Sequence, residues 1–133
     1  MSNRELARLF GYSEATVRRR VNALLEDGYI KIVALADPVR LGYTVDVIMG
    51  VEVQPGRVQE AAEAYADNDN VRSVTITSGA YDLIVAAMFR SNEELLAFTS
   101  EDLREIPGIT RVQTSNSLKV VKRTFDFFPE NLR

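Results

Sequence analysis

The sequence predicts an α+β protein in two parts. Residues 1–40 are expected to form a partial winged helix-turn-helix and linking strand, and residues 41–133 a ferredoxin-like βαββαβ domain. Two observations predict this class. Two short amphipathic segments near the N-terminus are separated by a glycine-containing turn. After residue 41, strand and helix periodicities follow in the order strand, helix, strand, strand, helix, strand.

The first helix is expected to begin at Asn3. Ser2 and Glu5 form a capping-box pattern around that start. Gly11 is expected to end the helix, because glycine adopts the positive φ of a helix C-terminus without strain. The apolar residues of this helix share one face: Leu6, Leu9 and Phe10.

A second helix is expected over residues 14–26, with Ser13 as its N-cap. Its apolar stripe consists of Val17, Val21, Leu24 and Leu25. At about 100° per residue, the opposite side presents Ala15, Thr16, Arg19 and Asn22, with Arg18 and Arg20 flanking the stripe. A helix that reads the DNA major groove needs small or polar residues near its start and arginines beside them. The candidate DNA-binding residues are therefore Ser13, Ala15, Thr16, Arg18, Arg19 and Arg20. An ordinary helical hairpin with a solvated arginine face is the alternative.

The charge distribution is compatible with both interpretations. Residues 1–40 hold seven basic and five acidic residues, a net charge of +2, and residues 41–133 hold nine and fourteen, a net charge of -5. The two values sum to the net charge of -3 for the chain. Such asymmetry suggests a basic recognition segment joined to an acidic body, although a difference of this size also arises by chance.

The segment Tyr29–Leu35 is rich in β-branched and aromatic residues and ends before Asp37-Pro38. This composition predicts a strand that links the two parts.

The second part shows a long alternating strand and a nearly all-apolar one. The expected elements are a strand over 43–54, a helix over 58–65, strands over 71–77 and 81–89, a helix from Ser91 to Ile106, a strand over 109–122 and a tail over 124–133. The strand over 81–89 is expected to be central, because its residues are apolar on both faces. The apolar residues expected to share one side of the last helix are Leu95, Leu96, Phe98, Leu103 and Ile106.

This arrangement predicts self-association. Helices are expected to cover one face of the sheet, and the sequence offers no third layer for the other face. Because a large exposed apolar sheet is unfavourable in water, a second copy of the chain is the expected cover. The expectation is a homodimer through the sheets, built up further into a higher homo-oligomer.

Composition excludes several classes of activity. The chain has no Cys and no His, so thiol chemistry, histidine bases and the commonest metal ligands are absent. No catalytic set, metal site or cofactor is expected, and an enzyme with this fold is a distant alternative. The pairs Glu93-Glu94 and Glu101-Asp102 are expected to solvate a helix face, and Phe125, Phe127 and Phe128 to pack on the body or a partner subunit. No membrane span or signal peptide is visible, and the composition is typical of a cytoplasmic protein.

The N-terminal part resembles the helix-turn-helix of the Lrp/AsnC (feast/famine) transcription regulators. The resemblance is carried by the run from Gly11 to Val21, in which a Tyr-Ser pair precedes Arg-Arg-Val, and by Gly28-Tyr29-Ile30. In that family an additional helix precedes this unit, and the present chain begins after the position of that helix.

The C-terminal part resembles the effector-binding and oligomerisation domain of the same family, called RAM and similar to ACT domains. Thr77–Leu83 looks like its Ser-Gly-x-aromatic-Asp turn, and Leu103–Ile109 like its Leu-Pro-Gly-Val element. Thr114 and Lys122 match residues of its last strand.

The resemblance implies a regulator of transcription that binds double-stranded DNA and senses a small molecule, usually an amino acid, at subunit interfaces. The candidate effector-binding residues are Asp82 for the ammonium group, Tyr81 as a wall, and Gly79, Ala80, Thr114 and Ser115 for the carboxylate. Structural roles for Asp82 as a turn cap and Gly79 as a positive-φ residue are the alternatives. A stand-alone ligand-sensing or oligomerisation module without DNA binding is the alternative function.

Overall fold

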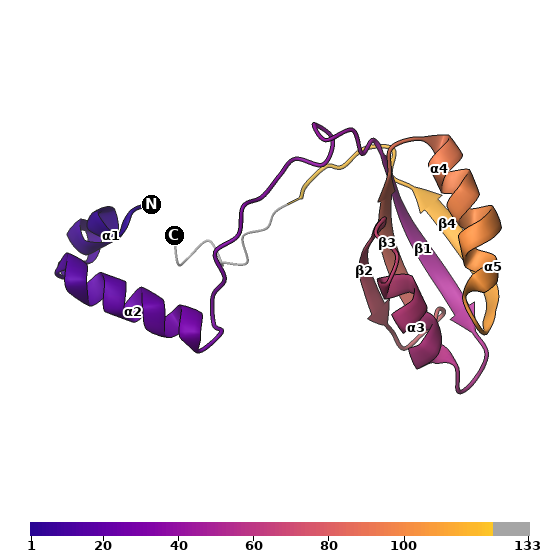
Figure 1. Cartoon of the computed structure of the whole chain (residues 1–133), viewed down its shortest axis with the longest axis horizontal. Coiled ribbons are helices and arrows are strands. Elements are labelled where there is room, and N and C mark those ends of the chain that lie inside the picture. The colour runs from indigo at the N-terminus through magenta and orange to yellow at the C-terminus, as the bar shows by residue number, and fades with distance from the viewer. Residues whose placement is uncertain (124–133) are drawn as a thin grey trace. The chain divides into compact units, whose positions relative to one another are not determined.

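The structure, a computed structural model, describes residues 1–123 apart from the side chains of residues 102 and 103 (Figure 1). The expected tail and its three phenylalanines lie outside the described residues. The chain divides into two compact units, Met1–Ala36 and a unit that begins at Asp37.

The first unit contains α1 (Asn3–Phe10) and α2 (Glu14–Glu26), which confirms the predicted helix-turn-helix. The capping box is formed, because the Ser2 hydroxyl accepts from the Glu5 amide at 3.3 Å and the Glu5 carboxylate accepts from the Ser2 amide at 2.6 Å. The hydrogen bond from the Ser2 backbone amide is the main cause that lowers the pKa of Glu5, and a hydrogen bond with the Ser2 side chain lowers this pKa further. Gly11 ends α1 at a φ of 68°.

The two helices enclose a small core. Ala7 and Val17 are buried at their contact. Leu9, on the predicted apolar face of α1, is 67% exposed, and Phe10 beside it is also exposed. The apolar face of α1 is therefore only partly covered by α2.

The predicted linking strand is not formed. Residues Tyr29–Leu35 have no strand partner within the described chain, and the side chains of Tyr29, Ile32 and Leu35 are exposed. A strand requires a neighbour to satisfy its backbone groups, so strand propensity alone was insufficient here.

Residues 37–123 of the second unit contain one antiparallel sheet of four strands in the order β2-β3-β1-β4. The strands are β1 (Val45–Val53), β2 (Val71–Ile76), β3 (Leu83–Phe89) and β4 (Ile109–Asn116). The order confirms the ferredoxin-like topology and the central position of β3.

The last strand is shorter than predicted. Asn116 pairs with Val47 near the start of β1, and the Ser117 amide donates to the Asp46 carbonyl at 2.8 Å. Because β1 begins at Val45, no described strand continues alongside residues 118–122, and the ladder ends.

Helices cover one face of the sheet (Figure 1). They are α3 (Val58–Ala66) and a helix composed of α4 (Asn92–Ala97), the π-helical turn η1 (Phe98–Asp102) and α5 (Leu103–Glu105). The prediction for Leu96 is wrong, since this side chain is 65% exposed while Leu95 packs on the core and Phe98 is buried.

The core between these layers is apolar, with a single buried hydroxyl group that has no partner. The rings of Tyr65 and Phe89 lie 6.4 Å and 5.2 Å from that of Phe98. Among the described residues, the buried Tyr65 hydroxyl has no hydrogen-bond partner. Burial raises the pKa of Tyr65.

No element of residues 37–123 covers the opposite face of the sheet, which is of mixed character. Alternation along β1 and β3 places Ile48, Ile84, Ala86 and Met88 on this face. Ile48 is 50% exposed. Charged residues lie beside this apolar row, so the face is more polar than the sequence predicted: Asp46, Glu52 and Arg111.

Candidate functional site

The start of α2 is fixed by two hydroxyl groups of the candidate DNA-binding set. Ser13 Oγ accepts from the Thr16 amide at 3.1 Å and lies 2.8 Å from Thr16 Oγ1. This arrangement confirms Ser13 as the N-cap. Both hydroxyls therefore contribute to capping, which reduces their freedom to contact other groups.

The three arginines of α2 have different surroundings. Arg18 lies 3.7 Å from the Glu14 carboxylate in an exposed pair. The Arg20 guanidinium stacks 4.6 Å from the centre of the Tyr12 ring, in the turn between the helices. Arg19 has neither an ion pair nor a ring contact within residues 1–123.

A shallow hollow runs along the exposed face of α2. Its lining consists of Ala15, Arg18, Arg19, Asn22, Ala23 and Glu26. The structure therefore brings three predicted DNA-binding residues together, and it adds Asn22, which was not in the predicted set. The helical projection already placed Asn22 on the side of Arg19, so this residue could have been found from the sequence.

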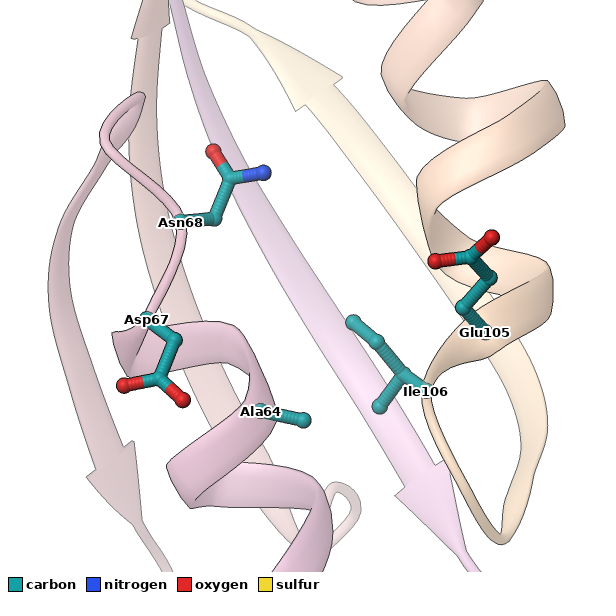
Figure 2. A pocket seen from close by; sticks show the side chains of 5 residues that line it. All are labelled: Ala64, Asp67, Asn68, Glu105 and Ile106. Carbon is teal, nitrogen blue, oxygen red and sulfur yellow. The ribbon is translucent and has the colours of Figure 1, made fainter.

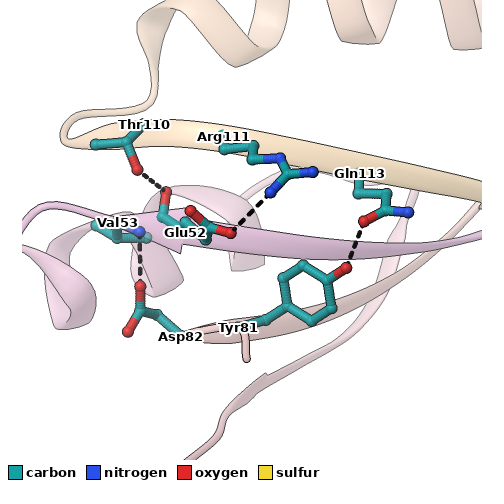
Figure 3. A network of polar contacts seen from close by, with 7 residues as sticks. All are labelled: Glu52, Val53, Tyr81, Asp82, Thr110, Arg111 and Gln113. Carbon is teal, nitrogen blue, oxygen red and sulfur yellow. Dashed lines mark hydrogen bonds and ion pairs between the residues drawn. The ribbon is translucent and has the colours of Figure 1, made fainter. Parts of the chain in front are cut away.

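The turn between β2 and β3 is held by hydrogen bonds to its own ends and to β1 (Figure 3). The Thr77 hydroxyl donates to the Tyr81 carbonyl at 2.7 Å, and the Thr77 amide to the Asp82 carbonyl at 2.9 Å. Asp82 contacts β1 twice, through its amide to the Val51 carbonyl at 2.9 Å and through Oδ2, which accepts from the Val53 amide at 2.8 Å. Asp82 thus fastens this turn to β1.

Tyr81 lies across β1 on the open face of the sheet. Its hydroxyl is hydrogen-bonded to Oε1 of Gln113 on β4 (Figure 3). The ring passes directly over Gly50, where an added Cβ would lie 2.7 Å from three ring carbons. Only glycine leaves room for this ring, so the two residues form one structural unit.

The predicted effector-binding residues lie on two separate parts of the second unit. Gly79, at a φ of 124°, and Ala80 are exposed in the turn next to β3. Thr114 and Ser115 lie on β4, which β1 separates from β3. Two strand spacings amount to about 10 Å. Asp82 and the two hydroxyls therefore lie on strands that are not adjacent in one chain.

A further hollow of about 290 Å³ lies between the end of α3 and the end of α5 (Figure 2). Its lining includes two carboxylates, on Asp67 and Glu105, and the apolar residues Ala64 and Ile106. The described residues contain no group of three or more acidic, histidine or cysteine side chains that could hold a metal ion. None of the described helices is long and apolar enough to cross a membrane.

The fold defines a protein with a helix-turn-helix unit and an α+β, ferredoxin-like domain. Residues 1–31 match a winged helix-turn-helix DNA-binding domain, and residues 46–127 match the Lrp/AsnC ligand-binding domain. The chain belongs to the Lrp/AsnC family.

Relatives and solved structures agree with this assignment. An HTH-type transcriptional regulator of Pyrococcus furiosus is 37% identical over 119 residues, which cover 89% of this chain and 80% of that protein. The regulator LrpA of Pyrococcus horikoshii is 33% identical over 89% of this chain and 84% of its own length.

Among solved structures, Escherichia coli AsnC superimposes with a TM-score of 0.86 at 26% identity, over 93% of this chain and 85% of AsnC. A transcriptional regulator of Neisseria meningitidis in complex with L-methionine gives a TM-score of 0.90 at 21% identity, over 100% and 88% of the two chains. The second likeness supports the fold.

Proposed function

We propose that this protein is a DNA-binding transcription regulator whose α2 enters the major groove. The supporting observation is the hollow on the exposed face of α2, which is lined by Arg19 and Asn22. The small side chains of Ala15 and Ala23 belong to the same lining. Small side chains let base edges approach the helix, and arginine and asparagine present the donors that base edges accept. In this proposal residues 1–40 form the DNA-binding part and residues 41–133 the sensing and assembling part.

A gel shift with the DNA upstream of the protein's own gene tests this function. We expect binding that weakens steeply with salt, because arginines displace counterions from the phosphates. Replacing Arg18 and Arg19 together by Ala is expected to abolish the shift. Arg57→Ala, which removes an exposed arginine of the second unit, serves as the control. Unchanged binding by the double variant would assign DNA binding to another surface and support the stand-alone module.

We also propose a homodimer through the open face of the sheet. The row of Ile48, Ile84 and Ala86 would be covered by the same row of a second copy, which fits a twofold interface. Light scattering after size exclusion tests this. Ile48→Lys is expected to give monomers, and Leu96→Lys, at an exposed position over the helices, is expected to leave the dimer intact. A wild-type monomer at micromolar concentration would refute the interface.

The proposed effector is an amino acid bound beside the turn of residues 77–82, with a neighbouring chain completing the site. Asp82 uses Oδ2 to accept from Val53, which leaves Oδ1 for an ammonium group. The position of Asp82 and of the β4 hydroxyls on strands that are not adjacent supports a site built from two chains. Thr114 and Ser115 of one chain would then act with Gly79, Ala80, Tyr81 and Asp82 of another.

Isothermal titration with a panel of amino acids tests this site. L-methionine is the first probe, since it is the ligand in the Neisseria complex. Asp82→Asn keeps an oxygen for the Val53 amide and removes the charge, so it is expected to lose binding and to keep the fold. The absence of heat with every amino acid would contradict the proposed effector.

A further inference from the structure

We infer that Arg19 and Asn22 are the two residues of α2 that read bases, whereas Arg20 binds a phosphate and Tyr12 positions Arg20. This inference rests on the proposed DNA-binding function and divides its residues by role. It follows from the different partners of the three arginines and from the composition of the hollow.

Arg19 and Asn22 share the exposed hollow and lie one helical turn apart. Three residues advance an α-helix by about 4.5 Å, close to the base-pair rise of about 3.4 Å, so the two side chains reach neighbouring base pairs. A guanidinium bonds in pairs to guanine O6 and N7, and a carboxamide to adenine N6 and N7. The small side chains of Ala15 and Ala23 also line the hollow and leave room for the base edges to approach α2. The pair therefore selects a guanine and an adenine at neighbouring positions of the site.

Arg20 is outside the lining of this hollow. Its guanidinium lies over the Tyr12 ring in the turn before α2. In a helix-turn-helix the elements before the recognition helix approach the DNA backbone, so this arginine is placed for a phosphate. Stacking over a ring leaves the edge of the guanidinium free to donate to phosphate oxygens.

Arg18 is partly neutralised by Glu14 at 3.7 Å, and Glu26 places a negative charge at the other end of the hollow. A phosphate is repelled by Glu26, which favours an approach of the DNA backbone away from the C-terminal end of α2. Glu26→Gln is therefore expected to raise the affinity for all DNA sequences without altering base preference.

The test is a selection of binding sites from randomised DNA with the full chain, followed by measurement of affinities for single base-pair substitutions at several salt concentrations. Asn22→Ala is expected to lose about tenfold to a hundredfold discrimination at one adenine position, and Arg19→Ala the same at the neighbouring guanine. Arg20→Ala is expected to weaken all sequences equally and to reduce the slope of log K against log salt by about 1.

Tyr12 provides a control for positioning. Tyr12→Phe keeps the stacked ring and should keep the wild-type salt slope, whereas Tyr12→Leu should behave like Arg20→Ala. Both substitutions lie at a partly exposed turn position, so loss of the fold would be visible in the circular dichroism.

Two outcomes are distinguishable. A wild-type chain that binds no DNA at low salt would overturn both the proposed function and this division of roles. If the wild type binds DNA, two results would overturn the division of roles alone. One is that Asn22→Ala selects the same sequence as the wild type, and the other is that Arg20→Ala changes the base preference.

Discussion

Replacing Gly50 by Ala tests the contact between β1 and the Tyr81 ring. An added Cβ would lie 2.7 Å from three ring carbons, well inside contact distance, so the ring must move. Forcing extra atoms into a packed position costs about 2 kcal/mol, and the lost hydrogen bond to Gln113 about 1 kcal/mol. The alanine itself raises the free energy of unfolding by about 0.7 kcal/mol, because glycine is unfavourable in a strand. The expected net loss is about 2 kcal/mol in the free energy of unfolding of the second unit.

The sign should reverse when the ring is absent. In a Tyr81→Ala background, Gly50→Ala has nothing to displace and is expected to stabilise the protein by about 0.7 kcal/mol. Urea unfolding of the four proteins of this cycle, at one fixed protein concentration, measures both values. Tyr81→Phe controls for the hydroxyl and should cost about 1 kcal/mol. Equal effects of Gly50→Ala in both backgrounds would show that the ring does not occupy this position.

Further predictions concern stability. Tyr65→Phe removes a buried hydroxyl without a partner and should stabilise the protein by about 1 kcal/mol in urea unfolding. Because burial raises the pKa of Tyr65 in the folded state, the unfolded state loses the phenol proton first above pH ~10, and the wild type loses stability there. The variant has no phenol and should therefore lose less stability above pH ~10. Gly108→Ala should lower the free energy of unfolding by about 1–2 kcal/mol more than Gly56→Ala in the same assay. Both glycines have a positive φ, but of the two only Gly108 lies where an added Cβ would meet another atom closely, the Cβ of Arg57 at 2.8 Å. Equal losses of stability would contradict this packing. Ser13→Ala should cost about 1 kcal/mol, measured as faster hydrogen exchange at the start of α2, and unchanged exchange would contradict the cap.

The local signals in the sequence were sufficient for most elements. Ser2 and Ser13 identified two helix starts, because capping involves residues three positions apart. The alternation along β1 identified it as a strand, and the apolar composition of β3 placed that strand in the centre of the sheet. Each of these features is decided by near neighbours in the chain.

Features that depend on distant residues were missed. The segment Tyr29–Leu35 has strand composition but no partner strand among the described residues, and propensity does not supply one. The contact of Tyr81 with Gly50 joins residues 31 positions apart, as the difference of their numbers shows, and no short pattern reveals it. For the same reason, the sequence motif around Asp82 did not disclose that its carboxylate accepts from the Val53 amide.

Among the candidate site residues, those on one helix were predicted best. Regular helical geometry predicted a common face for Ala15 and Arg19, which line one hollow, whereas Arg18 was expected beside the apolar stripe and lines the same hollow. The effector residues come from a turn and a separate strand, so grouping them required knowledge of the strand order.

The π-helical turn at Phe98–Asp102 has a consequence for changes in chain length. A turn of this kind accommodates one residue more than an α-helical turn. Leu95 before it and Ile106 after it both pack on the core. Loss of one codon within the turn would leave a regular helix with both side chains still directed inward. The same deletion inside α3 would rotate the following residues by about 100° and expose their apolar side.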